Sequence, residues 1–198
     1  MLQKSTFSQA FKRIIFPGGL VLACLLALSC GAAGADEKPT VQQLKRQALR
    51  GRQPALRVAV DSLVVCKSKR EMTAFRHGIR VKTYIISLGT APEGKKRMRN
   101  DNRTPEGLYT INGKNAASSY HRNLGISYPN AADRRYARAQ GLDTGGDIKI
   151  HGLPNQPRYS TEDYLYHDWT WGCIAVANEE VEELYRYVAV GTPILILP

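Results

Sequence analysis

Residues 148–173 decide the fold and the chemistry of this chain; they begin with the run IKIHG (148–152) and end with the run DWTWGC (168–173). Polar and apolar residues alternate before His151, which is typical of a strand that delivers a histidine to a glycine. Cys173 follows a glycine and precedes an apolar run. A histidine base and a cysteine thiol are the two groups that thiol catalysis requires, because the base removes the thiol proton and the thiolate attacks a carbonyl. The pattern therefore predicts a catalytic pair.

Length and charge limit the class of protein. The chain has 198 residues, 43% hydrophobic and 23% charged, which is typical of one globular domain with a short extension. The formal net charge is +11, which favours an anionic partner such as nucleic acid, a membrane surface or an acidic cell-wall polymer, or else a solvated basic surface. The chain contains no Gly-rich phosphate loop, zinc-finger spacing or aromatic-basic nucleic-acid motif, so we expect no nucleic-acid partner.

The N-terminus predicts export. Residues 1–29 contain basic residues and then a short apolar run, as a signal peptide does. Two processing sites compete: the run LALSC resembles a lipobox, which would lipidate Cys30, and the run AGA ends at Ala35, where an ordinary signal peptidase would cleave. A retained N-terminal anchor is a third reading. We expect a periplasmic or cell-envelope protein, with a lipid anchor if Cys30 is modified, and residues 30–54 as a polar tether.

Two cysteines remain in the mature domain, Cys66 and Cys173. An even count in an exported protein normally indicates a disulfide, but a bond between these two would consume the proposed nucleophile. Cys66 lies in a strand-like run, where a free cysteine packs as a small apolar residue. We therefore assign packing to Cys66 and chemistry to Cys173, with a redox lock between them as the alternative.

The domain, residues 55–198, is expected to be mostly β, a β-sandwich or small barrel with one or two helices. A hairpin turn is expected at 76–78, and residues 112–147 read as a long polar excursion that includes a short helix at 133–140. Asn178 is the expected N-cap of a helix with the spacing of Val181, Leu184, Tyr185 and Val188. Strands are expected at 56–60, 63–65, 71–75, 81–86, 108–111 and 192–197.

Three motifs now carry a resemblance. The His-Gly pair at 151–152, the Thr-x-Gly-Cys-Ile run at 170–174 and the TPEGxY run at 104–109 resemble the signatures of the L,D-transpeptidase (YkuD-type) catalytic domain over residues 55–198. Papain-like and NlpC/P60-type peptidases place their cysteine before the histidine, in the reverse order. Trp171 and Ala175 stand where the commonest family pattern has His and Arg. This looks similar to a divergent branch, some members of which are thought to hydrolyse peptidoglycan-linked bonds.

The resemblance implies acyl transfer on peptidoglycan stem peptides. Cys173 would attack the carbonyl of the L-centre of meso-diaminopimelate, and an amine would resolve the thioester. The implied partners are the stem peptides, wall-linked lipoprotein, and the membrane through an N-terminal lipid or signal; no cofactor or metal is implied. The implied site residues are Cys173 as nucleophile, His151 as general base and acid, the Gly152 carbonyl orienting His151, backbone N–H groups of Trp171 and Gly172 with that of Cys173 as the oxyanion hole, and Thr170, Trp169 and Tyr128 as substrate contacts.

Several alternatives stay open. Cys173 as a zinc ligand would need nearby partners, and the chain offers only His167, Asp168 and His121. Trp169 and Trp171 are either core residues or groove residues, and Asp168 either caps the turn or tunes the thiol. Lys149 and Arg158 either pair substrate carboxylates or are solvated. Three functions follow: a transpeptidase; a hydrolase on the same scaffold, either an L,D-carboxypeptidase or an amidase releasing wall-linked protein; and a non-catalytic wall-binding module.

Overall fold

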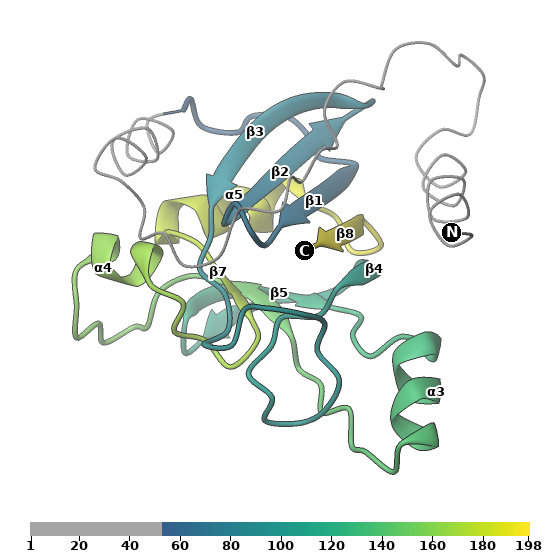
Figure 1. The fold of residues 1–198 in the computed structure, drawn as a ribbon. Helices are drawn as coiled ribbons and strands as arrows, with labels where there is room; N and C mark the ends of the chain where they lie inside the picture. The colour runs from purple at the N-terminus through teal and green to yellow at the C-terminus, as the bar shows by residue number, and fades with distance from the viewer. Residues whose placement is uncertain (1–52) are drawn as a thin grey trace. The chain divides into compact units, whose positions relative to one another are not determined.

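A computed structural model of the chain describes residues 53–198. The signal, cleavage, lipidation and most of the tether predictions therefore lie outside the described residues, Cys30 included. The described part is a single eight-stranded sheet in the order β3-β2-β1-β8-β4-β5-β6-β7 (Figure 1). Its strands are β1 (Ser62–Cys66), β2 (Glu71–Arg76), β3 (Ile79–Ile85), β4 (Gly107–Ser118), β5 (His121–Ile126), β6 (Lys149–His151), β7 (Ile174–Ala175) and β8 (Pro193–Leu197).

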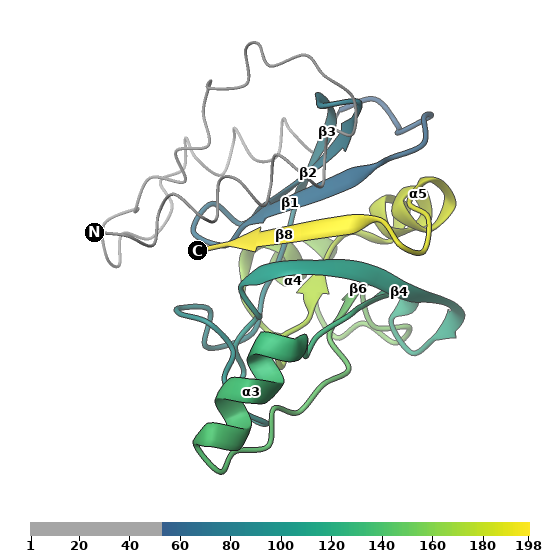
Figure 2. The ribbon, with the colours of Figure 1, turned by 90° about the vertical axis from the view of Figure 1, so that its right-hand side faces the viewer.

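One half of the sheet is a meander that receives the last strand of the chain. β1, β2 and β3 pair antiparallel, and β8 lies between β1 and β4, parallel to the first and antiparallel to the second (Figure 2). His77 and Gly78 connect β2 to β3 with φ angles of 52° and 75°. Two successive positive φ angles are those of a type I′ turn, which matches the twist of a hairpin. The expected hairpin turn at 76–78 is confirmed.

The other half brings the two ends of the sheet together. β4 and β5 form a long hairpin, β6 pairs antiparallel with β5, and β7 pairs parallel with β6. Ser87, which follows β3, forms two 2.9 Å backbone hydrogen bonds with Ala175 of β7. The sheet therefore closes on itself, as expected of a small barrel. Closure covers strand edges that would otherwise expose unpaired backbone groups.

Three helices occur in the described residues: α3 (Ala131–Ala139), α4 (Thr161–Tyr166) and α5 (Asn178–Tyr187). α5 buries Val181 and Leu184 completely against the core, as its apolar spacing predicts. The core also contains aliphatic side chains from both halves of the sheet, among them Ile111, Leu124, Ile150, Ile174 and Ile194. No helix within residues 53–198 is long and apolar enough to cross a membrane.

Some expected elements are wrong. Residues 56–60 form no strand beyond a bridge between Val60 and Val188, because no neighbouring strand pairs with the rest of the segment. Residues 112–126 are not a polar excursion, since β4 and β5 extend through them. Residues 53–198 contain three helices where one or two were expected, and α4 is the helix that was not predicted. The N-cap of α5 is Ala177, and Asn178 is the first helical residue.

The structure separates the two cysteines of the domain. Cys173 is a free cysteine. The alternative of a Cys66–Cys173 lock is therefore wrong. Because β1, which carries Cys66, pairs with β8 while Cys173 precedes β7, the two cysteines belong to different parts of the sheet. The thiol of Cys173 is available for chemistry.

Candidate active site

Two short parallel strands bring His151 and Cys173 together. β6 and β7 pair Ile150 with Ile174 and His151 with Ala175. In the same register Cys173 lies beside Lys149, which is two residues before His151 on β6. Ile150 and Ile174 are completely buried on the core face. Because side chains alternate along a strand, His151 and Cys173 share the opposite face. Residues 22 positions apart in the chain thus become neighbours at one edge of the closed sheet.

The His151 ring is held in one orientation. Its Nδ1 lies 2.7 Å from the carbonyl oxygen of Gly152, and a carbonyl only accepts, so Nδ1 carries the proton and Nε2 presents a lone pair. The Tyr120 ring lies 4.7 Å from the imidazole, centroid to centroid, and the Trp169 ring meets it edge-on at 5.6 Å. This is the tautomer that a base at Nε2 requires.

Gly152 is a glycine for a packing reason. A Cβ at this position would lie 2.6 Å from the side-chain oxygen of Asn178 and 3.0 Å from the Cβ of His121. The same Asn178 oxygen accepts a 2.8 Å hydrogen bond from the Leu153 N–H. The carbonyl that orients His151 is therefore fixed between α5 and the tip of the β4–β5 hairpin.

Burial keeps both reactive groups neutral at rest. It lowers the pKa of His151 to about 4, against a smaller opposing effect of the hydrogen bond to Gly152. Burial also raises the pKa of Cys173, against a hydrogen bond from the Lys149 backbone that favours the thiolate. The thiol donates to the Asp147 carbonyl, with 3.7 Å between sulfur and oxygen. The arrangement is a neutral thiol beside a neutral base, so proton transfer must accompany attack.

The turn before Cys173 is built on Thr170. Thr170 is 4% exposed, and its hydroxyl donates to the Cys173 carbonyl at 2.8 Å and accepts from the Gly172 N–H at 3.2 Å. Its backbone bonds to Leu88 and Thr90, each at 3.0 Å. Thr170 therefore shapes the turn, and its hydroxyl is occupied there rather than facing a substrate. The Gly172 N–H is likewise occupied in this conformation.

The predicted aromatic contacts separate into three environments. Trp171 is 84% exposed beside the nucleophile, and so is a surface residue rather than a core one. Trp169 is half-buried and packs against His151, with its indole N–H buried and without a hydrogen-bond partner within the described residues. Tyr128 is 5% exposed and donates to the Thr144 carbonyl at 3.0 Å. Tyr128 therefore packs in the core.

Asp168 anchors the loop before the turn. The Arg70 guanidinium donates to both of its oxygens, the shortest contact being 2.6 Å, and the Leu88 N–H donates at 2.8 Å. The carboxylate is thus a tether to Arg70 and to the segment after β3, a third role beside the two that the sequence left open. Lys149 pairs with Asp147 at 2.7 Å.

The zinc alternative finds no support in residues 53–198, which contain no group of three His, Cys, Asp or Glu side chains placed to hold a metal. His121 instead pairs with Glu182, with 2.8 Å between Nε2 and Oε1. His167 Nδ1 lies 2.9 Å from the Asp163 carbonyl at the end of α4. Each histidine thus has a partner of its own away from the catalytic pair of the sequence prediction.

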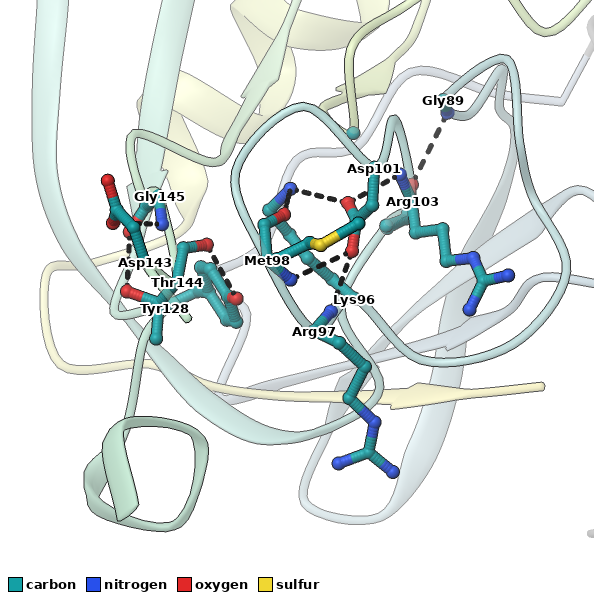
Figure 3. Close-up of polar contacts among 12 residues, drawn as sticks. Gly89, Lys96, Arg97, Met98, Asp101, Arg103, Tyr128, Asp143, Thr144 and Gly145 are labelled. Atoms are coloured by element: carbon teal, nitrogen blue, oxygen red, sulfur yellow. Dashed lines mark hydrogen bonds and ion pairs between the residues drawn. The ribbon is translucent and has the colours of Figure 1, made fainter. Parts of the chain in front are cut away.

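The role of residues 96–103, which support the turn before Cys173, was not predicted from the sequence. Asp101 accepts from the Lys96 ammonium at 2.7 Å and from the backbone N–H groups of Arg97, Met98 and Arg103 (Figure 3). The Arg103 carbonyl oxygen lies 2.5 Å from where a Gly172 Cβ would be. The run Asn100-Asp101-Asn102 was the available signal for an ordered loop, because Asn tolerates the positive φ that both asparagines adopt here.

The comparisons with known proteins agree on one family. The family model described as the L,D-transpeptidase catalytic domain (YkuD) matches residues 60–196. The Escherichia coli (strain K12) protein named "Putative L,D-transpeptidase YafK" is 30% identical over 108 residues, which are 54% of this chain and 36% of that protein. The Bacillus subtilis (strain 168) protein named "Putative L,D-transpeptidase YqjB" is 31% identical over 99 residues, which are 50% of this chain and 54% of that protein. The matched part thus spans about a third to a half of these relatives.

Solved structures share the fold. The helical cell shape determining protein Pgp2 from Campylobacter jejuni superposes with a TM-score of 0.52 at 23% identity, over 76% of this chain and 53% of that one. Bd1075 from Bdellovibrio bacteriovorus gives 0.50 at 21% identity, over 71% and 48%. With the family model matching well over half of the sequence, the chain belongs to the L,D-transpeptidase (YkuD) catalytic domain family.

Proposed function

We propose that this protein is a cysteine-dependent L,D-transpeptidase that acts on peptidoglycan stem peptides. One observation carries the proposal: Cys173 is a free thiol on the same face of paired strands as His151, whose Nδ1 is held by Gly152. A wall-binding module would need neither a nucleophile nor an oriented base. Family membership supports the substrate class, the wall polymer.

The reaction proceeds in two acyl transfers. His151 Nε2 takes the Cys173 proton as sulfur attacks the carbonyl of the L-centre of diaminopimelate in the donor stem. The tetrahedral oxyanion collapses, the C–N bond breaks, and His151 returns the proton to the departing amine of D-Ala. An acceptor amine then attacks the thioester and loses a proton to His151, which passes it to the Cys173 sulfur as the new amide forms. The enzyme ends with its original thiol and imidazole.

The turn around Cys173 supplies the electrostatic stabilisation. We assign the oxyanion donors to the backbone N–H groups of Trp171 and Cys173, since that of Gly172 bonds to Thr170. Each such donor is worth about 3–4 kcal/mol in comparable acyl-transfer sites. Trp171 exposes its indole at the mouth of the site, where an aromatic face suits a sugar or peptide chain. Trp169 and Tyr120 both pack against the imidazole and against each other.

Location and partners follow from the sequence. We propose export to the cell envelope, with lipidation at Cys30 or cleavage after Ala35, and residues 30–54 as the tether. Stem peptides are then the donor, and a second stem or a wall-linked lipoprotein contributes the acceptor. No cofactor enters the reaction, because thiol, base and backbone donors complete it.

The decisive experiment incubates the protein with purified disaccharide-tetrapeptide, with and without glycine, and follows the products by mass spectrometry. Cross-linked dimers or glycine-exchanged stems are expected. Cys173→Ala and His151→Gln should each abolish turnover, whereas His77→Asn, in the β2–β3 turn, should retain it and serves as the matched histidine control. Turnover by Cys173→Ala would refute the assignment of the nucleophile.

A second function has one observation in its favour. Ala175 stands where the common family pattern has Arg, and the divergent branch with this feature includes sequences thought to hydrolyse. Water would then resolve the thioester, either as an L,D-carboxypeptidase or as an amidase that releases wall-linked protein. Tripeptide formation that glycine does not alter would select this hydrolase over the transpeptidase.

The thiol can also be labelled directly. A carbapenem should add its mass to Cys173, because the strained lactam imitates the acyl donor. The adduct should be absent from Cys173→Ala, and peptide mapping should place it on no other residue. An adduct elsewhere in the chain would contradict the proposed nucleophile.

A further inference from the structure

α3 stands away from the sheet and is attached to it along one narrow stripe (Figure 2). Only Asp133 and Ala137 of its nine residues are buried. Asp133 accepts from the Tyr109 hydroxyl at 2.8 Å and pairs with Lys95 at 2.7 Å, so its charge is neutralised inside the protein. The remaining surface of the helix faces solvent.

That exposed surface is basic and contains no acid. Arg134, Arg135 and Arg138 are all exposed, and the only acidic residue of the helix is the buried Asp133. Arg134 and Arg138 are four residues apart, where like charges repel and weaken a helix. Arg134 donates to the Pro129 carbonyl, and Arg138 lies in the last turn, where a cation suits the helix dipole. Neither contact brings a negative charge to the arginines, so α3 presents their positive charge to solvent.

A neighbouring loop extends the basic surface. The Arg97 guanidinium lies 4.2 Å from the centroid of the Tyr136 ring, so loop and helix are in contact. Arg99 pairs with Asp143 at 2.6 Å, which removes the nearest exposed carboxylate from competition. We define the basic exosite as four arginines: Arg97, Arg134, Arg135 and Arg138.

The same loop leads directly to the catalytic turn. Asp101 fixes residues 96–103 by four hydrogen bonds (Figure 3). At the end of the segment, the Arg103 carbonyl packs against Gly172. Arg97 lies six positions before Arg103, a span of at most about 22 Å even in an extended chain. A polymer whose stem peptide occupies Cys173 can therefore also touch the basic exosite.

We propose that the basic exosite binds carboxylates of the anionic wall polymer beside the stem that reacts. This inference rests on the proposed function for the identity of the polymer. Guanidinium groups suit carboxylates, because two parallel N–H groups match the two oxygens. A cluster of uncompensated charge also attracts an anionic polymer before the reacting stem is placed.

A bilayer surface fits the exosite less well. Membrane-docking helices present a broad apolar face to the lipid. The exposed face of α3 carries arginines, and its one large apolar side chain, Tyr136, lies under Arg97. The exosite thus offers charge without an apolar surface to insert.

The test measures binding of the full chain, carrying Cys173→Ala to stop turnover, to purified sacculi in a sedimentation assay. One variant adds Arg134→Gln, Arg135→Gln and Arg138→Gln. The matched control adds Arg57→Gln, Arg80→Gln and Arg186→Gln, which remove the same charge from exposed positions outside α3. The exosite variant should bind at least about ten-fold more weakly than the control, and the gap should close as salt rises from about 0.05 M to about 0.5 M. Thermal melting verifies that both variants are folded.

Three results would overturn the proposal. The first is an equal loss of sacculus binding in both triple variants, and the second is sacculus binding by the exosite variant that equals that of the parent. The third is a loss of binding seen only on vesicles of phosphatidylglycerol and phosphatidylcholine. The last would identify the surface as membrane-binding. Turnover of soluble disaccharide-tetrapeptide by the unmodified protein tests the proposed function separately. If that turnover is absent while the sacculus result holds, the reaction is wrong and the exosite stands.

Discussion

Gly172 illustrates how one residue connects backbone geometry to reactivity. It takes φ +119°, a conformation that residues with a Cβ rarely adopt, and a Cβ there would lie 2.5 Å from the Arg103 carbonyl oxygen. Glycine is therefore required twice, once for the dihedral and once for the close approach of two backbone segments. The turn places Cys173 next to Lys149 and ahead of β7.

We predict that Gly172→Ala costs about 1–3 kcal/mol in the free energy of unfolding, because the turn must strain or move away from Arg103. It should also slow carbapenem acylation of Cys173. Urea unfolding and mass spectrometry measure the two effects. Gly113→Ala is the control, since a Cβ at Gly113 meets nothing within 4 Å. Equal stability of the two variants would contradict the argument.

The titration of His151 should appear in the stability of the fold. Burial lowers its pKa to about 4, so between its ordinary pKa near 6.5 and about 4 the unfolded chain binds a proton that the folded chain does not. Acidification through this range therefore favours the unfolded state, and the free energy of unfolding decreases as the pH decreases. His151→Gln should lose less stability than the parent between about pH 7 and about pH 4.5 in urea titrations. Parallel curves for the two proteins would show that His151 is not buried neutral.

At the scale of elements, the site depends on segments that carry no catalytic residue. The loop 96–104 supports the turn from one side, and the hairpin β4–β5 supports the histidine from the other through Tyr120. Asp101 organises the loop: burial opposes its ionisation, but hydrogen bonds from Lys96 and three backbone N–H groups outweigh it and lower the pKa of the carboxyl. The carboxylate therefore stays charged inside the protein.

Removing Asp101 should be costly, because Lys96 would remain buried without its partner. We expect Asp101→Ala to lower the free energy of unfolding by about 3–5 kcal/mol. Asp143→Ala, which breaks the exposed pair with Arg99, should cost less than about 1 kcal/mol. Below the melting temperature of both variants, alkylation of Cys173 by iodoacetamide should change only in Asp101→Ala. A similar small cost for both would mean that the loop is held by other contacts.

At the scale of the molecule, closure of the sheet makes the site depend on the whole domain. β7 is two residues long, yet it pairs with β6 on one side and with Ser87 on the other. β8, from the end of the chain, lies between β1 and β4 and joins the first half of the sheet to the second. A strand of two residues has little stability of its own, so the nucleophile is placed only when the sheet is complete.

Unfolding should accordingly be cooperative across both halves. Ile174→Ala in β7 and Ile194→Ala in β8 each remove a completely buried side chain and should each cost about 2–5 kcal/mol. Both should shift one common transition, followed in urea by circular dichroism and tryptophan fluorescence. Separate transitions for the two probes would indicate that the half with the site unfolds independently.

Features that depend on residues close together in the chain could be predicted from the sequence. Positive φ at His77 and Gly78 makes the hairpin turn that the residues predict, and the apolar spacing of α5 matches the burial of Val181 and Leu184. α4 was predictable but missed: Ser160 and Asp163 form a reciprocal capping box that can be read from the sequence. The His-Gly and Gly-Cys motifs likewise indicated the family, because their order and spacing are local features.

Tertiary structure alone decided which segments meet. Leu56 and Val60 are buried while Val58 is exposed, as in a strand, yet residues 56–60 form none, because a strand needs a hydrogen-bonding neighbour. Tyr128 packs in the core, although the family resemblance implied a substrate contact. The parallel register of β6 and β7 and the closing pair Ser87–Ala175 join residues far apart in the chain. No local pattern encodes such contacts, since they depend on the packing of the complete sheet.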